Sequence, residues 1–488
     1  MIDWSARKGP YLWMCGVLGL YAVVFLVYAE TQAFAFDESY HLLAAQLIDA
    51  GRIPYIDFCF PQTPLNAYWN AAWMRLLGQN WHVPHAFAAL FTIGAVFLVA
   101  DFVYFHFPVP SWREAAGLTA GLLAGLHNMV FEYGPLGQAY GICLFLLVAS
   151  FRIAVVAVHR KGPLLAATVG LVAGTAAGSS LLSAAAAPVL LGWILHCNRA
   201  GVRWKKGVAF CAAMAVPFAP VYWLAWLGPR QTWFNLFQYH YFYRKLYWPD
   251  TTRHDLEVLT YWIDSGQGLV LGILVVAGLL YLIRMSPWAR EVKAEFYLCA
   301  WLAAGLMAEV GRAHPTFTQY FLLAMPFLAI LATPGLYIIG TRLFASERPL
   351  LTAALVTGFV ACALAKATYY EVKDTNNWHV YERLAKKIDQ VTPRNAPVLA
   401  DEPIYFLTKR TPPPGYELYY THELKLAPAD AKLFHILYKT DVKKQVQAGA
   451  FATAFNCDDD EIADYDLKNH FKQHAEMDDC TVFWDFKK

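Results

Sequence analysis

Residues 36–68 read FDESYHLLAAQLIDAGRIPYIDFCFPQTPLNAY and directly follow the first long apolar stretch of the chain. The segment opens with two adjacent acids, Asp37 and Glu38. Apolar side chains then recur at helical spacing over residues 38–50, and a glycine follows at a suitable end for a helix. A second helix is expected over residues 64–77, which begin at a proline and also precede a glycine. The segment therefore predicts two short helices along a membrane surface, with acids beside the first.

The composition of the whole chain is that of a protein embedded mostly in lipid. Of its 488 residues, 58% are hydrophobic and 16% are charged, whereas about a quarter are charged in an ordinary soluble domain. The net charge of +2 is too small to indicate a protein that binds nucleic acid. Residues 371–488 hold 36 of the 76 charged side chains. We therefore expect a membrane domain over residues 1–370 and a small polar domain over residues 371–488.

Eleven apolar stretches are long enough to be membrane spans, which predicts an α-helical polytopic membrane protein. They lie near residues 11–29, 85–105, 115–131, 138–158, 163–178, 180–197, 207–227, 266–283, 294–310, 317–340 and 349–367. Lys and Arg gather in the short connections on one side, and two long loops, 30–84 and 228–265, lie on the other. By the positive-inside rule the N-terminus is cytoplasmic, and both long loops and the C-terminal domain face outward.

The C-terminal residues predict a small α/β domain. A helix is expected over residues 379–390, and strands are expected over 396–401, 451–455 and 481–486. The acidic run 458–461 is either a solvated turn or a calcium site, although it lacks the spacing of a calcium loop. Cys457 and Cys480 both lie in this outward domain, where a disulfide is permitted but not required.

The first outward loop resembles that of a known family. An acidic pair after the first span, a surface helix, a Gly-x-x-Pro-Tyr-x-Asp segment at residues 51–57 and a Pro-Leu-x-x-Tyr segment at residues 64–68 are similar to the first periplasmic loop of GT-C glycosyltransferases. The branch that it resembles includes bacterial relatives of protein O-mannosyltransferases and the aminoarabinose transferase of lipid A. The resemblance implies transfer of a sugar from a polyprenyl-phosphate carrier to a lipid, polysaccharide or protein acceptor. The reaction would take place, usually with inversion, on the outer side of a bacterial cytoplasmic membrane.

The resemblance assigns the role of general base to Asp37. An acceptor hydroxyl must give up its proton as it attacks, and a carboxylate placed beside it can take that proton. The alternative role of Asp37 is to cap the N-terminus of the first surface helix. Glu38 and Asp57 are supporting acids, and Tyr55 and Gln62 either line the sugar pocket or only shape the turn.

A metal ion is possible but not required by this pattern. Asp37 and His41 are four residues apart, so both side chains can face one divalent ion from a single helix. Two ligands alone make a weak site, and a surface hydrogen bond is the simpler account. No other cofactor is indicated.

Cations for the carrier phosphate are expected at two further places. The second outward loop is rich in aromatic residues and holds His240, Arg244 and Lys245, which either face phosphate or anchor the loop among lipid head groups. The outer end of the ninth span carries Arg312 and His314, with Tyr320 following. This segment resembles the one in which the superfamily contacts the carrier phosphate.

One segment departs from the family pattern. Relatives commonly place a second acid at the start of the fourth span, but Gln138 stands there in this chain. Glu132 lies at the end of the preceding helix and is the candidate substitute, although its register differs. Both are expected to contribute to the sugar or acceptor pocket.

Two other classes of protein fit many spans with outward acids. One is a transporter, and the other is an export or binding subunit for lipid-linked glycans. Ion-coupled transporters keep ionisable residues near the middle of the membrane, whereas Asp101, Arg152 and Glu309 fall near the ends of the predicted spans. That placement favours chemistry at the membrane interface.

Overall fold

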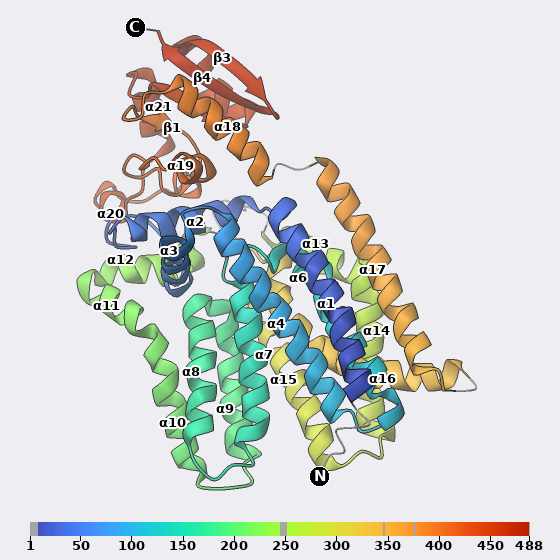
Figure 1. The fold of residues 1–488 in the computed structure, drawn as a ribbon. Helices are drawn as coiled ribbons and strands as arrows, with labels where there is room; N and C mark the ends of the chain where they lie inside the picture. The colour runs from blue at the N-terminus through green and yellow to red at the C-terminus, as the bar shows by residue number, and fades with distance from the viewer. Residues whose placement is uncertain (1–7, 245–250, 345–346, 375–376, 488) are drawn as a thin grey trace. The chain divides into compact units, whose positions relative to one another are not determined.

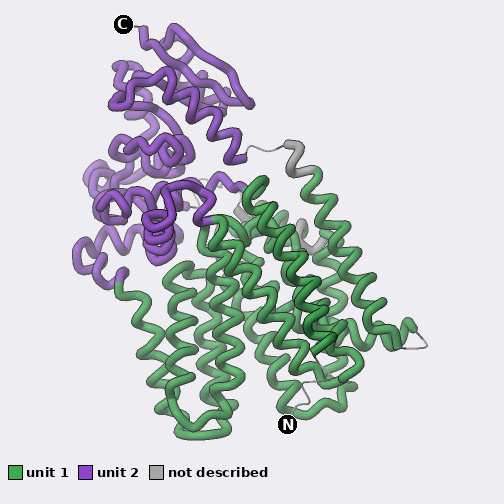
Figure 2. Tube along the Cα trace, in the orientation of Figure 1, with its two compact units in different colours: residues 1–33, 85–219, 250–373 green, residues 34–84, 220–249, 374–488 purple. Residues whose placement is uncertain are grey.

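The computed structural model describes residues 8–244, 251–344, 347–374 and 377–487. By their contacts these residues form two compact units, coloured green and purple in Figure 2. Unit 1 comprises Met1–Ala33, His85–Ala219 and Asp250–Lys373, and unit 2 comprises Phe34–Pro84, Pro220–Pro249 and Asp374–Lys488. The first predicted outward loop and the beginning of the second thus belong to the same unit as the C-terminal residues.

Unit 1 is built of helices, drawn in Figure 1. They are α1 (Lys8–Thr31), α4 (His82–His106), α5 (Arg113–Gly125), α6 (Asn128–Tyr133), α7 (Tyr140–Ala157), α8 (Leu164–Ser179), α9 (Ala186–His196), α10 (Arg203–Ala215), α13 (Thr251–Asp264), α14 (Gly266–Leu280), α15 (Arg290–Arg312), α16 (Met325–Leu343) and α17 (Pro349–Asp374). Short 3-10 or π turns, η1 (Pro110–Trp112), η2 (Leu181–Ala185), η3 (Val216–Phe218), η6 (Tyr281–Met285) and η7 (Thr318–Ala324), extend or join several of them.

The predicted helical membrane fold is confirmed. Within the described residues, eight helices are long and apolar enough to cross a membrane, and two shorter apolar helices cover Leu164–Ser179 and Leu181–His196. The span expected at 115–131 is divided between α5 and α6. Helices or 3-10 turns thus cover most of each of the eleven predicted stretches.

Glycines allow two helix pairs of unit 1 to approach closely. A β-carbon at Gly335 of α16 would lie 1.9 Å from the carbonyl oxygen of Leu274 in α14. One at Gly170 of α8 would lie 2.1 Å from the carbonyl oxygen of Phe210 in α10. Small residues at such crossings let backbones touch, which is how helices associate where water provides no driving force.

Unit 2 contains the two helices predicted after the first span. They are α2 (Phe36–Asp49) and α3 (Leu65–Leu77), and residues of the second loop add α11 (Ala219–Leu227), α12 (Pro229–Trp233) and the π-helix η4 (Phe234–Tyr243). Most side chains of α2 are buried within unit 2, where it packs against α3 and α19 (Glu402–Thr408).

The C-terminal residues form the predicted α/β domain. Its helices are α18 (Trp378–Val391), α19, η8 (Tyr419–Thr421), α20 (Pro428–Leu433), α21 (Lys439–Gln447), α22 (Asp459–Asp464) and α23 (Leu467–His470). Its strands are β1 (Val398–Leu399), β2 (Thr453–Asn456), β3 (Phe471–Met477) and β4 (Cys480–Phe486), in the order β1-β2-β4-β3. The β1–β2 pair is parallel and the other two pairs are antiparallel. The expected helix and three strands are present, and β3 is an addition.

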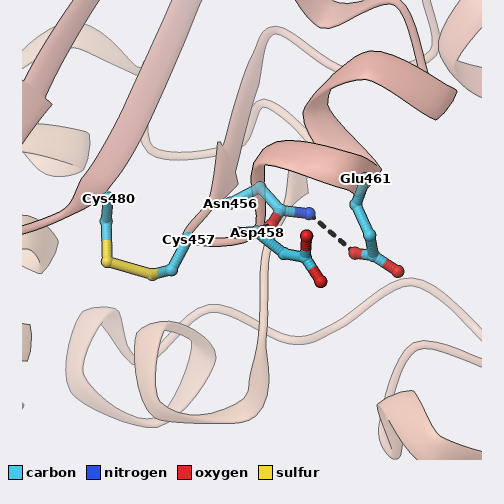
Figure 3. The surroundings of a disulfide bond; sticks show 5 residues. All are labelled: Asn456, Cys457, Asp458, Glu461 and Cys480. Atoms are coloured by element: carbon cyan, nitrogen blue, oxygen red, sulfur yellow. Dashed lines mark hydrogen bonds between the residues drawn. A yellow bond between two sulfur atoms is a disulfide. The ribbon is translucent and has the colours of Figure 1, made fainter.

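A disulfide joins Cys457 to Cys480, as Figure 3 shows. The acidic run beside it begins α22, because the side chain of Asp458 accepts a hydrogen bond of 2.8 Å from the backbone N–H of Asp460. Glu461 points to Asn456 and accepts a hydrogen bond of 2.8 Å from its side-chain amide. These carboxylates thus serve local structure, and no group of three or more possible metal ligands is found in the part of the chain that is described.

Candidate functional site

The predicted catalytic acids lie in the first turn of α2. The N-cap residue of this helix is Ala35, and no side chain caps it. Asp37 is therefore inside the helix, and the capping alternative has no bond to support it. Acids in a first turn interact favourably with the helix dipole. Glu38 is fully buried, and its carboxylate accepts a hydrogen bond of 3.1 Å from the indole nitrogen of Trp378.

Asp37 has two polar neighbours from distant parts of unit 2. The hydroxyl of Tyr420 donates a hydrogen bond to its carboxylate, and the guanidinium of Arg244 acts on it as a nearby positive charge. The side chain keeps surface open to solvent, but the surrounding protein removes part of its hydration. That desolvation raises the pKa of Asp37, while Arg244 and Tyr420 oppose the rise. The carboxylate of Asp37 is thus accessible to solvent, and its ionised form is stabilised by one cation, Arg244, and one hydrogen-bond donor, Tyr420.

The second loop contributes Arg244 and His240 to the same unit. Nε2 of His240 lies 2.8 Å from the carbonyl oxygen of Pro61, which fixes it as a donor. The pKa of His240 is lowered to about 4, mainly by desolvation and to a smaller extent by the positive charge of Arg244. His240 is consequently neutral near pH 7 and holds the first loop, so Arg244 is the cation of this pair. Lys245, predicted beside them, lies outside the described residues.

The Gly-x-x-Pro-Tyr-x-Asp segment forms a tight turn. Tyr55 is fully buried with a positive φ of 71°, and its hydroxyl donates to the backbone carbonyl of Gln62. The carboxylate of Asp57 accepts a hydrogen bond of 2.7 Å from the backbone N–H of Ile53. In this structure these contacts shape the loop, and they leave the side chain of Gln62 half-buried.

Asn235 ties the two loops together and was not predicted. Its side-chain oxygen accepts a hydrogen bond of 2.8 Å from the backbone N–H of Phe60, and its amide donates to the carbonyl of Gln231 at 2.9 Å. Asn235 is fully buried. One amide in an aromatic stretch gives no pattern that sequence reasoning can use, which is why it was missed.

His41 is placed unfavourably for sharing a metal ion with Asp37. Its ring packs against the rings of Tyr40 and Phe60, and burial lowers its pKa to about 3. Nδ1 of His41 has no hydrogen-bond partner. Asp37 on the same helix is exposed instead. Among the described residues no third ligand joins these two.

The remaining predicted site residues belong to unit 1. Nδ1 of His314 lies 2.5 Å from a carboxylate oxygen of Asp255, whose other oxygen accepts a 2.7 Å hydrogen bond from the backbone N–H of Thr316. Asp255 was not predicted, and it orients the imidazole. Arg312 is largely exposed and lies 3.7 Å from Glu309 on its own helix.

The polar residues predicted near the fourth span, and Tyr320 near the tenth, are buried or half-buried. Gln138 is buried, with 6% of its surface exposed. Glu132 is half-buried and accepts a hydrogen bond from the side chain of Asn128 one helical turn before it. Tyr320 is half-buried in η7, where its ring packs against that of Phe317.

Comparison with solved structures defines the fold. ArnT from Cupriavidus metallidurans bound to undecaprenyl phosphate superposes with a TM-score of 0.69 at 13% sequence identity, and the match covers 98% of each chain. The apo state of the same protein gives a TM-score of 0.66 at the same identity and coverage. The chain has the GT-C fold. An oligosaccharyltransferase from Archaeoglobus fulgidus is a more remote match, with a TM-score of 0.48, 11% identity and coverage of 91% of this chain and 69% of that one.

No protein-family model matches the sequence, and no curated protein matches it. At 13% sequence identity, the similarity to ArnT establishes the fold and nothing about the reaction. What the site does must be argued from its own residues.

Proposed function

We propose that this protein is a membrane glycosyltransferase that moves a sugar from a polyprenyl-phosphate carrier to an acceptor on the outer side of the bacterial cytoplasmic membrane. The observation that carries the proposal is the environment of Asp37, a solvent-reachable carboxylate with a tyrosine donor and an arginine cation beside it. The similar ArnT structure, which holds undecaprenyl phosphate, supports a carrier of this chemical class.

The reaction that fits these groups is a single displacement. The acceptor oxygen attacks the anomeric carbon, the bond from that carbon to the phosphate oxygen breaks, and its electron pair leaves on the carrier phosphate. Asp37 takes the proton from the acceptor oxygen. Arg244 offsets the negative charge that develops on the phosphate, since a guanidinium matches two phosphate oxygens. A single displacement inverts the anomeric configuration.

The proposal also assigns supporting roles and an orientation. Glu38 supports the loop from within unit 2, and Arg312 and His314 are assigned to the carrier phosphate. The N-terminus is cytoplasmic and the C-terminal domain is extracytoplasmic, where the Cys457–Cys480 disulfide is stable. The acceptor is a lipid, a polysaccharide or a protein.

Mass analysis of envelope glycans tests the proposal. Cells with the wild-type gene, cells without it, and cells with Asp37→Asn or Asp49→Asn in its place are compared for membrane glycolipids, polysaccharides and glycoproteins. Asp49 is the matched control, because it lies at the far end of α2, where it contacts Gln79 and Arg75. We expect one sugar substituent to be absent without the gene and with Asp37→Asn, and present with Asp49→Asn. An unchanged glycan profile in the deletion would contradict a transferase.

A further inference from the structure

Glu402, at the start of α19, is a buried carboxyl group that no sequence pattern singles out. Only 1% of its surface is exposed. Its Oε1 accepts a hydrogen bond of 2.7 Å from the backbone N–H of Tyr419. Its Oε2 is buried and has no hydrogen-bond partner. A buried ionised oxygen without a partner is costly, so the neutral acid is the form that this environment favours.

The charges around Glu402 favour the same form. Asp37 of α2 acts on it as a negative charge, and no ion pair of Glu402 occurs within the described residues. Burial is the main cause that raises the pKa of Glu402, to about 7. The charge of Asp37 adds to the rise, and the hydrogen bond from the Tyr419 N–H opposes it. The other titratable groups that interact with it are Tyr381 of α18, Asp401 and Tyr405 beside or within α19, and Tyr420 of η8. None of these groups is a cation.

Asp37 is also desolvated, which raises its pKa, but a cation and a side-chain donor stand beside it, which Glu402 lacks. The Arg244 guanidinium and the Tyr420 hydroxyl both favour the ionised form of Asp37. When two neighbouring carboxyl groups meet different environments, one keeps the proton and the other stays charged. Glu402 therefore keeps the proton, because its buried Oε2 has no partner. Asp37 stays ionised, because Arg244 and Tyr420 stabilise its charge.

Two hydrogen bonds to adjacent residues also connect the two groups. Glu402 holds the backbone N–H of Tyr419, and the next residue, Tyr420, donates its hydroxyl to Asp37. The position of the tyrosine ring relative to Asp37 therefore depends on the anchor at Glu402.

We propose that Glu402 is a positioning residue for the transfer reaction: as a neutral acid it anchors the Tyr419–Tyr420 turn, so that Tyr420 is directed at Asp37, and it leaves Asp37 as the ionised base. This inference rests on the function proposed above. During turnover Asp37 takes the acceptor proton and later releases it to solvent. Below its pKa of about 7 Glu402 keeps its own proton, so the proton balance there involves Asp37 alone. The C-terminal domain thereby contributes to the chemistry of the first loop.

Two variants of the full-length protein test the proposal through the pH dependence of kcat/KM. Glu402→Gln keeps an oxygen for the Tyr419 N–H and imitates the neutral acid. We expect its kcat and the acid limb of its profile to match the wild type. Glu402→Ala removes the anchor, so Tyr420 is no longer held. We expect the acid limb of the kcat/KM profile to move to higher pH, because Asp37 loses a donor that favours its ionised form. We expect kcat to fall about tenfold, because that is the effect of losing one hydrogen bond to a charged group.

Other outcomes overturn the proposal. If Glu402 were ionised, Glu402→Gln would remove a negative charge beside Asp37 and move the acid limb to lower pH. If Glu402 only filled space, Glu402→Ala would leave the acid limb in place.

Infrared difference spectroscopy separates this inference from the proposed function, because it needs no substrate. The difference between the wild-type and Glu402→Gln spectra at pH 6 should contain the carbonyl band of one protonated carboxyl group, because bands of other protonated acids, such as Asp401, cancel. A difference spectrum without that band would refute the protonation of Glu402. If the band behaves as expected but no sugar transfer is found, the proposed function fails and the state of Glu402 stands.

Discussion

Replacement of Arg52 by alanine tests how the first loop is held to the C-terminal domain within unit 2. The guanidinium of Arg52 lies 3.0 Å from the carboxylate of Glu417 and also donates to the backbone carbonyl of Asp57. The side chain of Glu417 is 2% exposed and that of Arg52 is 25% exposed. After the replacement, Glu417 retains the backbone N–H of Gly415 at 2.7 Å as a donor, but it has lost its cation.

The expected loss of stability follows from this burial. Removal of one partner from a fully buried pair costs about 3–5 kcal/mol. Because the arginine is partly exposed, we expect Arg52→Ala to lower the free energy of unfolding by about 2–3 kcal/mol near pH 8. Burial raises the pKa of Glu417 and Arg52 opposes the rise, so the variant has the higher pKa. A carboxyl group whose pKa is higher in the folded state loses stability as pH rises from its unfolded value of about 4.5 through its folded value. The deficit of the variant should therefore be small at pH 5 and should grow toward pH 8.

Denaturant unfolding of the purified full-length protein in detergent, at pH 5 and pH 8, measures this difference. Arg75→Ala is the matched control, because Arg75 is 78% exposed and lies 3.9 Å from Asp49. The control should change stability by no more than about 0.5 kcal/mol at either pH. A deficit of Arg52→Ala that is equal at both pH values, or no larger than that of the control, would refute the ion-pair argument.

Two further replacements probe contacts of the site. Tyr420→Phe removes a hydrogen bond that lowers the pKa of Asp37, so the acid limb of kcat/KM should move to higher pH by about one unit; an unmoved limb would show that the hydroxyl does not act on Asp37. Asn235→Ala leaves the backbone N–H of Phe60 buried without its acceptor, which should lower the free energy of unfolding by about 1–3 kcal/mol. An unfolding midpoint equal to that of the wild type would show that Asn235 does not join the two loops.

The membrane helices and the first-loop helices were predictable because their signals are local. Apolar length alone predicted the spans, and helical spacing with flanking proline and glycine predicted α2 and α3. The division of the 115–131 span between α5 and α6 was not predicted, since apolar composition does not show where a helix stops. Strand β3 was missed because it carries charged and polar residues at most positions and pairs only with β4.

The candidate site was predictable only in its first-loop half. Asp37 and Glu38 stand together in a recognisable segment, but their partners Tyr420 and Trp378 lie more than 300 residues away. Glu402 follows another acid in a polar domain, and nothing in its local sequence shows that it is buried. Such contacts are created by folding of unit 2, so one sequence without its structure does not reveal them.

The most direct measurement is single-turnover transfer from a polyprenyl-phosphate-linked sugar by the purified protein and its Asp37→Asn variant, with Asp49→Asn as control. Binding of the carrier lipid is measured on the same three proteins. The proposed role of Asp37 predicts that Asp37→Asn binds the carrier as the wild type does, while its transfer rate falls by at least about 100-fold, and that Asp49→Asn transfers at the wild-type rate. Transfer by Asp37→Asn at a rate close to that of the wild type would contradict the central claim.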